Sequence, residues 1–520
     1  MKAKYESLYQ INTRVWLTSL AEKLKEPAAL DDIPESALDA LKAQGFDRLY
    51  FLSVWQTGAR GREISRRQPG WLREFHETLP DLREEDIQGS GFAVKNYVTA
   101  DALGGDEALK RLRERLQARG LKLMLDFVPN HTALDHPFVE SHPEYYVEGT
   151  EEDINRAPQN FIRLKSGGRE RIFAHGRDPY FDGWPDTLQL NYGSKASQKA
   201  MRSEIMRIAG QCDGLRCDMA MLVLPEIFQR TWGLQADEFW SETIATVKKT
   251  YPDFCFMAEV YWDMEWRLQE LGFDYTYDKR LYDRLRDREA QPVYLHLKAE
   301  PAYQNKMARF MENHDEPRAA AVFDLPCHKA AAAVTYLSPG LRFFHQGQFE
   351  GRQKRISPHL VRGPREAKDQ ELASFYDKLL PLVTSDLLKE GKFTLLETKR
   401  AWSDNYTNLC FLAFTWQRQE SRSLVVINYA DHNSQCYLPL PFDNLSGADF
   451  QLTDLLSTDC YRRAGNDLVN PGLYLDMEPW QVQIFQFEKA SAAANKVDKA
   501  TGPADSNADQ GSDGHRSGNC

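Results

Sequence analysis

Two charged residues, Arg216 and Asp218, stand two positions apart at the end of a short apolar run in the segment DGLRCDMAM (213–221). On a β-strand the side chains of residues i and i+2 point to the same face, so this pair should meet. A neighbouring guanidinium favours the charged form of a carboxyl group and lowers its pKa. A carboxylate must be deprotonated before it can attack, so the pair predicts an activated nucleophile. Taken alone, the same pattern also fits a surface ion pair.

A second carboxyl group, that of Glu259, follows the apolar run FCFMA (254–258) and precedes Val260, Tyr261 and Trp262. A carboxyl group in apolar and aromatic surroundings keeps its proton to a higher pH, as a general acid must. Glu259 is therefore predicted to donate a proton, although a Glu after a strand is by itself also compatible with an ordinary surface position.

The elements that must position these side chains recur as helix, stop, buried strand and polar residue. Strands are expected at 12–17, 48–54, 121–125, 214–217 and 254–258, and helices at 34–43, 106–119, 197–209 and 237–249. On the second of these helices Leu109, Leu112 and Leu116 form a stripe that should be buried. Helices alternating with buried strands are typical of an α/β protein with a parallel sheet.

A closed barrel and an open sheet both fit that alternation. The barrel is favoured because charged residues follow several different strands, and barrels build their sites at those strand ends. An open sheet more often carries one Gly-rich phosphate turn, and the sequence has no GxGxxG or Walker-type loop. The predicted fold class is therefore α/β, a (β/α)8 TIM barrel with a small inserted domain after the third strand and a C-terminal all-β sandwich.

Composition shifts set the expected domain boundaries. Residues 132–191 interrupt the alternation with prolines and polar residues, which is typical of an inserted domain. From 392 onward the pattern turns to strands, expected at 409–416, 424–428 and 481–487. Residues 489–520 lack aromatic residues and should be disordered. The predicted organisation is a barrel at 1–131 and 192–391, an inserted domain at 132–191, a β domain at 392–488 and a tail at 489–520.

Length and charge narrow the class of protein. A chain of 520 residues is too long for one compact core, and a net charge of −11 argues against a nucleic-acid surface. Four arginines do gather at positions 60, 62, 66 and 67, where a solvated loop is the simpler interpretation. We therefore expect no nucleic acid among the partners.

The expected compartment follows from the N-terminus and the cysteines. The first residues, MKAKYESLYQINTRVW, lack the apolar run of a signal peptide, and no stretch of about 20 apolar residues follows. The 8 cysteines are scattered without a CxxC pair, which fits reduced thiols better than disulfides or a zinc site. These features predict a cytoplasmic protein without membrane contact.

Four segments stand together with the chemistry described above: DFVPNH (126–131), GLRCDMAM (214–221), MAEVYW (257–262) and FMENHD (310–315). Each is weak alone, but their order and spacing, with PGLRFFHQGQ (339–348) after them, resemble glycoside hydrolase family 13, the α-amylase superfamily. The resemblance extends from about residue 12 to about residue 488. Retaining glycosidases need two carboxyl groups about 5–5.5 Å apart, one as nucleophile and one as acid/base. Asp218 and Glu259 fit those two requirements.

The resemblance implies a role for each matching residue. Asp218 matches the nucleophile that forms a covalent glycosyl–enzyme intermediate, Glu259 the general acid/base, and Asp315 the third carboxylate, which grips sugar hydroxyls. The remaining matches are His131 and His314, which hydrogen-bond the sugar, Arg216, which orients the nucleophile, and Asp126, which supports the site. Either histidine alone would also fit a purely structural role.

The sequence departs from the family pattern at two places. A GYxxxDY-like stretch reads GFAVKNY (91–97), so Phe92 can offer the sugar an apolar platform but no phenolic hydrogen bond. Met221 and Leu222 replace the Lys and His that many α-amylases carry after the nucleophile. Asn130 matches one calcium ligand of the best-known members, but Leu222 has no side-chain donor for the other. We therefore expect no metal and no cofactor, and a structural role for Asn130.

The resemblance implies a retaining hydrolase that acts on α-1,4-glucans or malto-oligosaccharides. A transglycosylase on the same scaffold is the first alternative, because water and sugar acceptors compete for one intermediate. A non-catalytic carbohydrate-binding homologue is the second, and the presence of all three carboxylates weighs against it.

Overall fold

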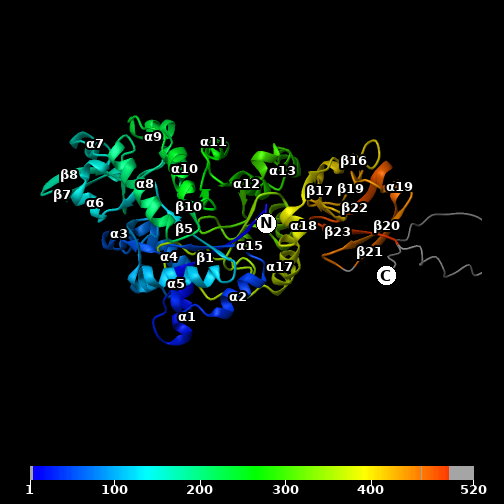
Figure 1. Ribbon diagram of the computed structural model, residues 1–520, viewed down its shortest axis with the longest axis horizontal. Coiled ribbons are helices and arrows are strands. Elements are labelled where there is room, and N and C mark those ends of the chain that lie inside the picture. The colour runs from blue at the N-terminus through cyan, green and yellow to red at the C-terminus, as the bar shows by residue number, and fades with distance from the viewer. Residues whose placement is uncertain (1–3, 458, 491–520) are drawn as a thin grey trace, which may run out of the picture.

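A computed structural model describes residues 4–457 and 459–490. Eight parallel strands close into a barrel in the order β1-β14-β13-β12-β11-β10-β5-β2, which confirms the predicted (β/α)8 fold. The barrel strands are β1 (Ser7–Asn12), β2 (Arg48–Leu52), β5 (Lys122–Phe127), β10 (Gly214–Cys217), β11 (Cys255–Ala258), β12 (Tyr275–Tyr277), β13 (Met307–Arg309) and β14 (Leu341–His345). Figure 1 shows the barrel in the middle of the molecule, with a smaller lobe at one end and a β domain at the other.

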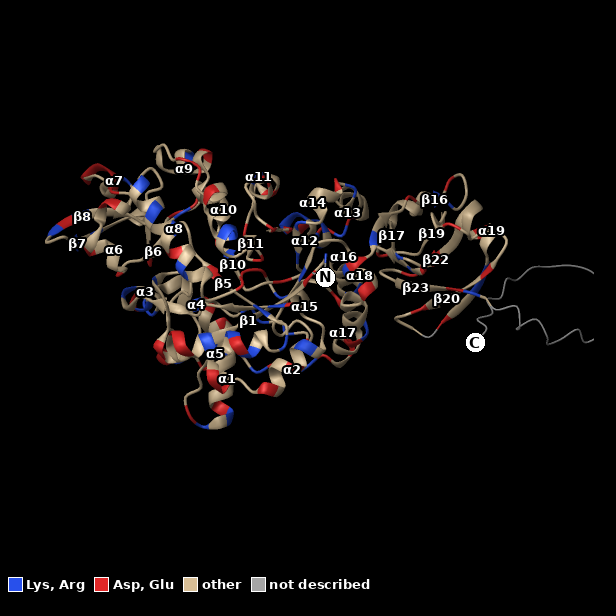
Figure 2. Cartoon of the chain, in the orientation of Figure 1, with Lys and Arg blue, Asp and Glu red and all other residues tan. Residues whose placement is uncertain are grey.

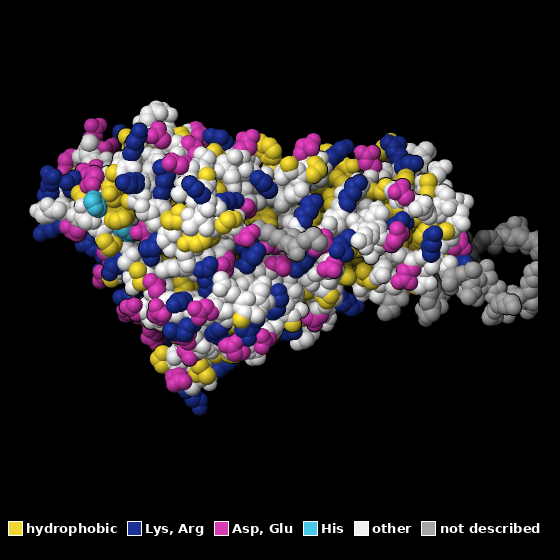
Figure 3. Space-filling model, viewed as in Figure 1, with side chains coloured by type: hydrophobic (Ala, Val, Ile, Leu, Met, Phe, Trp, Pro, Cys, Tyr) yellow, Lys and Arg dark blue, Asp and Glu magenta, His cyan; other side chains and the backbone are white. Residues whose placement is uncertain are grey.

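Helices cover the outside of the barrel and pack through apolar stripes. On α5 (Gly105–Gln117) the residues Leu109, Leu112 and Leu116 are buried, as their spacing predicts. The other main helices of the barrel are α1 (Thr13–Leu24), α2 (Glu35–Ala43), α8 (Lys195–Ala209), α10 (Trp240–Thr250), α12 (Lys279–Arg286), α16 (Leu325–Leu337) and α17 (Gln370–Val383). Acidic and basic residues both occur along these helices, and the visible surface mixes both signs (Figures 2 and 3).

The strand expected at 12–17 is wrong. The first strand is β1 at Ser7–Asn12, and residues 13–17 begin α1. Asn12 caps this helix, because its side chain accepts a hydrogen bond from the backbone nitrogen of Val15 at 3.3 Å. The run RVWL is rich in residues that favour strands, but the cap and the buried Leu17 and Leu20 fix a helix.

The segment between β5 and α8 forms the smaller lobe. It contains β6 (His131–Ala133), α6 (Pro137–Ser141), α7 (Glu151–Arg156), β7 (Phe161–Ser166), β8 (Arg169–Ala174) and β9 (Thr187–Gln189). The first and last of these strands pair with each other, His131 opposite Gln189, so the segment leaves and returns at one point of the barrel. That closure supports the proposed inserted domain at 132–191.

A second excursion follows β2 and was not expected from the sequence. It holds β3 (Trp55–Thr57), α3 (Ala59–Ser65), α4 (Pro69–Thr78) and β4 (Val94–Thr99). The solvated loop predicted for the arginine cluster is wrong: Arg60 and Arg62 belong to α3, and Arg66 caps its end. Arg66 also donates to the backbone oxygen of Ile87 at 3.1 Å, which ties the helix to the rest of the excursion.

Two sheets form the C-terminal domain. One has six strands in the order β15-β17-β18-β23-β20-β21, and the other has three in the order β16-β19-β22. The bounds are β15 (Lys392–Leu395), β16 (Lys399–Arg400), β17 (Phe411–Arg418), β18 (Ser421–Asn428), β19 (Ser434–Leu438), β20 (Asp449–Asp454), β21 (Cys460–Ala464), β22 (Leu473–Met477) and β23 (Val482–Lys489). Leu424, Cys436, Leu475 and Phe485 belong to the core between the sheets, which confirms the sandwich.

The middle of the six-stranded sheet, formed by β17 and β18, is buried on both faces, whereas the edge strand β21 is largely exposed. Along β17 the side chains of Leu412, Phe414 and Trp416 join the core of the barrel, whereas Phe411 and Ala413 join the core of the sandwich. Trp416 donates its indole N–H to the backbone oxygen of Leu337 at the end of α16, at 2.8 Å. Alternate residues of β17 therefore pack into two different hydrophobic cores, that of the barrel and that of the sandwich.

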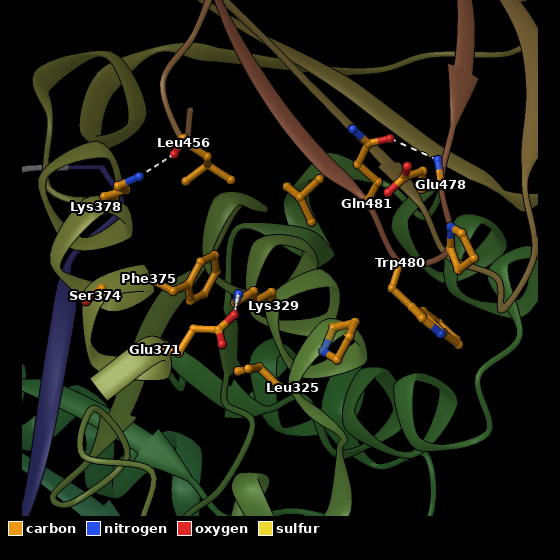
Figure 4. A pocket seen from close by; sticks show the side chains of 13 residues that line it. Leu325, Lys329, Glu371, Ser374, Phe375, Lys378, Leu456, Glu478, Trp480 and Gln481 are labelled. Atoms are coloured by element: carbon orange, nitrogen blue, oxygen red, sulfur yellow. Dashed lines mark hydrogen bonds and ion pairs between the residues drawn. The ribbon is translucent and has the colours of Figure 1, made fainter. Parts of the chain in front are cut away.

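The junction between barrel and sandwich leaves a pocket of about 510 Å³. Figure 4 shows Lys329 and Glu371 on facing helices and Trp480 on the β-domain side. The Lys329 ammonium and the Glu371 carboxylate lie 2.7 Å apart, and both residues line the pocket.

The last described strand sets the start of the predicted tail. Lys489 pairs with Phe450 in the six-stranded sheet, and the backbone nitrogen of Ala490 donates to Asp449 at 2.9 Å. The tail boundary at 489 is therefore two residues too early. Residues 491–520, which we predict to be disordered, lie outside the described residues.

Candidate active site

The predicted site residues gather where the barrel strands end. Asp218 follows β10, Glu259 follows β11, and Asp315 lies in the loop after β13. Because neighbouring parallel strands run in register, Arg216 on β10 lies opposite Asp126 on β5 and Met257 on β11. The carboxyl ends of these strands therefore bring together side chains that are far apart in the sequence.

The guanidinium of Arg216 is the centre of the site. It is fully buried, and its Nη1 lies 2.6 Å from Asp218 Oδ1, while its Nη2 lies 2.7 Å from Glu259 Oε2. Asp315 Oδ2 and Asp126 Oδ1 stand further away, at 3.8 and 3.9 Å. One cation thus faces four carboxyl groups, and Arg216 holds the two predicted reacting groups on adjacent nitrogens.

The expectation that Arg216 gives Asp218 a low pKa is wrong in direction. The pKa of Asp218 is raised to about 6, because burial and the neighbouring Asp315 and Asp126 all raise it, while the Arg216 charge and hydrogen bond only partly offset these effects. The carboxylate is still the form that Arg216 favours. Asp218 Oδ1 is held by Arg216, and Oδ2 has no hydrogen-bond partner among the described residues.

Glu259 has the environment expected of an acid. Its pKa is raised to about 7, because burial and the neighbouring Asp218 raise it more than Arg216 lowers it. Its Oε2 also accepts a hydrogen bond from the backbone nitrogen of Met219 at 2.7 Å, and its Oε1 accepts one from the Tyr261 hydroxyl at 2.9 Å. At neutral pH this carboxyl group therefore holds a proton for a large part of the time.

Asp315 is the most accessible of the three predicted catalytic carboxylates. Its side chain is 40% exposed, compared with 11% for Asp218 and 4% for Glu259. Burial would raise its pKa, but the His314 ring, 3.0 Å away, and Arg216 outweigh that effect and lower it to about 2. Asp315 therefore offers a permanent negative charge and acceptor oxygens to a ligand that approaches its exposed side.

His314 is held from two sides. Its Nδ1 lies 3.0 Å from the Gln10 amide nitrogen on β1, and its ring stacks on Phe92 with centroids 5.1 Å apart. The Phe92 ring also lies 5.2 Å from the Arg216 guanidinium. Phe92 thus stands inside the cluster, at the position predicted for an apolar platform.

Asp126 and His131 lie at the periphery of the cluster. Asp126 accepts hydrogen bonds from the Tyr50 hydroxyl and from the backbone nitrogen of Ser53, so its oxygens are engaged in holding β2 and β5 together. His131 on β6 bonds to the backbone of Phe92, and burial lowers its pKa to about 3. It is therefore a neutral ring at neutral pH. All eight predicted site residues are contiguous in the structure.

Several residues that follow the barrel strands near the site have a left-handed backbone conformation. Ser53, Met219, Trp262 and Asp263 have φ values of 61°, 41°, 62° and 63°, which residues other than glycine seldom adopt. Each stands at the turn that follows a barrel strand. Such conformations persist only where the surroundings enforce them, and here they aim the Ser53 and Met219 nitrogens at Asp126 and Glu259.

The sequence did not point to several residues that complete the site. Gln10, Tyr50 and Tyr277 contact the predicted residues from other strands, and the Tyr277 hydroxyl accepts from Arg216 Nε at 3.2 Å. No local pattern could identify them, because their partners are tens to hundreds of residues away. Tyr261 is different, since it stands two positions after Glu259 and the period of a strand places it on the same face.

The residues at the family's calcium position do not fit a cation. The Gln189 amide nitrogen donates to both oxygens of Asn130, at 2.9 and 3.0 Å, and to the backbone oxygen of Leu190 at 3.0 Å. Leu222 is buried and offers no side-chain donor. Within 4–457 and 459–490, no group of three or more His, Cys, Asp or Glu side chains is arranged to hold a metal.

No helix in the described parts of the chain is both long and apolar enough to cross a bilayer.

Comparisons with known proteins place this geometry in a family. The family described as "Alpha amylase, catalytic domain" matches residues 71–379. The α-amylase MalA of Haloarcula japonica is 24% identical over 399 residues, which cover 75% of this chain and 54% of that protein. The α-1,4-glucan:maltose-1-phosphate maltosyltransferase of Bifidobacterium longum is 25% identical over 231 residues, covering 44% of this chain and 25% of that protein.

The fold has a close solved counterpart. The structure of a noncanonic maltogenic α-amylase, AmyB from Thermotoga neapolitana, superposes with a TM-score of 0.67 at 17% identity, covering 94% of this chain and 99% of that one. The chain spans a little over half the length of the curated α-amylases that it matches. With more than half of its own length matched by the catalytic-domain family, the chain belongs to the α-amylase family, glycoside hydrolase family 13.

Proposed function

We propose that the protein is a retaining glycoside hydrolase that cleaves α-glucosidic bonds of α-1,4-glucans or malto-oligosaccharides. One observation carries the proposal: a single buried guanidinium holds Asp218 and Glu259 side by side, at 2.6 and 2.7 Å, in a chain of the α-amylase family. This pairing supplies an ionisable nucleophile and a protonated acid within one site, as double displacement requires.

The chemistry would proceed in two steps. Asp218 Oδ2 attacks the anomeric carbon while Glu259 gives its proton to the glycosidic oxygen, so the glycosidic bond breaks and a glycosyl ester forms on Asp218. Water then loses a proton to Glu259 and attacks the same carbon, which releases Asp218. Asp315 and the two histidines bind the sugar hydroxyls, and Phe92 packs against the apolar side of the sugar ring.

A transglycosylase remains the alternative, and one relative, the maltosyltransferase, is named for glycosyl transfer. The two activities differ only in whether water or a sugar hydroxyl enters the second step. We further propose that the protein works in the cytoplasm on sugar substrates, without nucleic acid. Buried thiols such as Cys212, Cys217 and Cys436, none in a disulfide, suit a reducing compartment.

The test begins with the anomer released. Incubation with maltotriose, followed by NMR of the first product, should show an α-anomer, because two inversions restore the configuration. A β-anomer as the first product would remove Asp218 from the role of nucleophile.

Two substitutions test the roles of the carboxyl groups. Asp218→Asn and Glu259→Gln should each lower kcat by about 100-fold or more with little change in KM, because both groups act in the transition state. Thermal melting should stay close to that of the wild type. A variant that keeps a tenth of the wild-type turnover would lose its proposed role. Thin-layer analysis of products longer than the substrate decides between transfer and hydrolysis.

A further inference from the structure

Among the described residues, Tyr261 is the one whose hydroxyl bonds to the acid/base, and it has no part in the two steps described above. Its oxygen lies 2.9 Å from Glu259 Oε1. The other oxygen, Oε2, already faces the Met219 nitrogen and the Arg216 cation, both at 2.7 Å. An oxygen that accepts a hydrogen bond from a backbone nitrogen and forms an ion pair with a guanidinium is the poorer place for a proton. The proton of Glu259 therefore belongs on Oε1, beside Tyr261.

We propose that Tyr261 is a positioning residue that keeps the transferable proton of Glu259 on Oε1 and aims that oxygen at the leaving group. The proposal rests on the proposed function, since it assigns a partner to the acid of that reaction. A phenol suits the task because its hydroxyl can accept a hydrogen bond from the protonated acid and donate one to the carboxylate.

The local backbone holds Tyr261 in this position. Glu259 and Tyr261 are two residues apart in the stretch that follows β11, and the hydrogen bond between them shows that their side chains meet. The next two residues, Trp262 and Asp263, are both left-handed, and the backbone nitrogen of Met264 donates to Tyr261 at 3.3 Å, so the chain turns sharply away. Strained backbone directly after an acid/base is the kind of feature that a functional constraint maintains.

Contacts from other elements brace the same turn. Asp263 forms an ion pair with Arg280 on α12, and the Trp262 ring packs edge-on against Tyr180 of the smaller lobe, with centroids 5.0 Å apart. These contacts fix the turn independently of the Tyr261 hydroxyl. Removing that hydroxyl should therefore leave the backbone in place, which makes a clean test possible.

In this proposal Glu259 gives up one proton in the first step and regains one in the second, and the Tyr261 hydroxyl keeps its own proton in both. In the first step the Oε1 proton moves to the glycosidic oxygen as the bond to the anomeric carbon breaks, and the Tyr261 hydroxyl turns its own hydrogen toward the new carboxylate. In the second step Oε1 takes a proton from the attacking water, and the hydroxyl turns back. Burial and the nearby Glu259 and Asp315 raise the pKa of Tyr261, so it stays protonated throughout.

The experiment compares two leaving groups on one donor. Maltotriose and α-maltosyl fluoride can place the same two glucosyl units in the site, but glucose needs a proton to leave and fluoride needs far less help. Tyr261→Phe should lower kcat on maltotriose about tenfold or more and change kcat on the fluoride less than about threefold. The alkaline limb of kcat/KM should move to higher pH, because the carboxylate loses a donor.

A matched control removes a phenolic hydroxyl elsewhere. Tyr474→Phe alters a 45% exposed residue of the β domain and should leave both rates and the pH profile unchanged. Equal losses on both substrates with Tyr261→Phe, or an unshifted alkaline limb, would overturn the positioning role. Wild-type protein that cleaves neither substrate would instead overturn the proposed function itself, so the two failures are distinguishable.

Discussion

At the scale of single residues, the site depends on how one buried cation is shared. Arg216 cannot neutralise four carboxyl groups, so burial leaves Asp218 and Glu259 with raised pKa values while His314 helps to keep Asp315 charged. The sequence could predict Asp218 and Glu259 from local pattern. It could not predict the direction of the Asp218 pKa shift, because that depends on burial and on carboxyl groups from other strands.

The raised pKa values predict a narrow pH range for activity. Asp218, with a pKa raised to about 6, must lose its proton, and Glu259, with a pKa raised to about 7, must keep its own. Activity should therefore fall on the acid side as Asp218 protonates and on the alkaline side as Glu259 ionises. We expect kcat/KM for maltotriose to peak between these two values.

Stopped assays across pH 4 to 9, with stability checked at each pH, measure this profile. On α-maltosyl fluoride the alkaline limb should be shallower, since that leaving group needs little proton transfer. A flat profile up to pH 9 on maltotriose would contradict the assignment of Glu259 as the acid.

At the scale of elements, the ends of the barrel strands position the site residues, and two segments between strands form excursions from the barrel. The repeated helix–strand pattern made the barrel predictable, and β10 has the predicted bounds. The excursion with α3 and α4 was not predictable, because its core joins Phe75, Leu79 and Ile87 to Leu360 from a distant loop. Read locally, those residues look like scattered apolar positions in a polar segment.

The hydrogen bonds from Gln189 on β9 to Asn130 predict that calcium affects neither the activity nor the stability of the protein. Three oxygens, two of them from Asn130, already receive hydrogen bonds from the Gln189 amide nitrogen, so a cation there would have to displace a protein group. EDTA treatment followed by gel filtration should change neither activity nor Tm. Added calcium should bring no concentration-dependent rise in Tm.

Gln189→Leu provides the comparison for this experiment. It removes the donor from three buried acceptors and should lower the stability by about 1–3 kcal/mol, with or without EDTA. A Tm that falls several degrees with EDTA and recovers with calcium would show that a metal, rather than Gln189, closes the lobe.

At the scale of the whole molecule, the β domain is part of the barrel's packing. The sequence predicted the strands of this domain. It did not predict which face of β17 packs against the barrel and which against the other sheet, because Leu412, Phe414 and Trp416 are as apolar as Phe411 and Ala413. A strand that is apolar on both faces must be covered twice. In this chain the barrel helices and the three-stranded sheet provide the two covers.

Removing residues 491–520 should leave Tm and activity unchanged. The segment lacks aromatic residues and offers little apolar surface to offset the entropy of ordering it. The cut belongs after Ala490, because Lys489 and Ala490 complete the pairing of β23 with β20. Calorimetry and maltotriose assays of the shortened protein provide the measurement, and a Tm lower by several degrees would show that the segment docks.

The double burial of the middle of the six-stranded sheet also bears on how such a protein can change over generations. A β domain that touched its neighbour through a polar rim could be exchanged for another by recombination, with the rest of the protein intact. Here a recombination event just before β15 would introduce a different β domain. The sheet face of that domain would not fit against Leu337 and the end of α16, as the face with Trp416 does in this chain. Barrel and sheet must therefore be inherited together, and substitutions in one of the two should persist mainly when the other accommodates them.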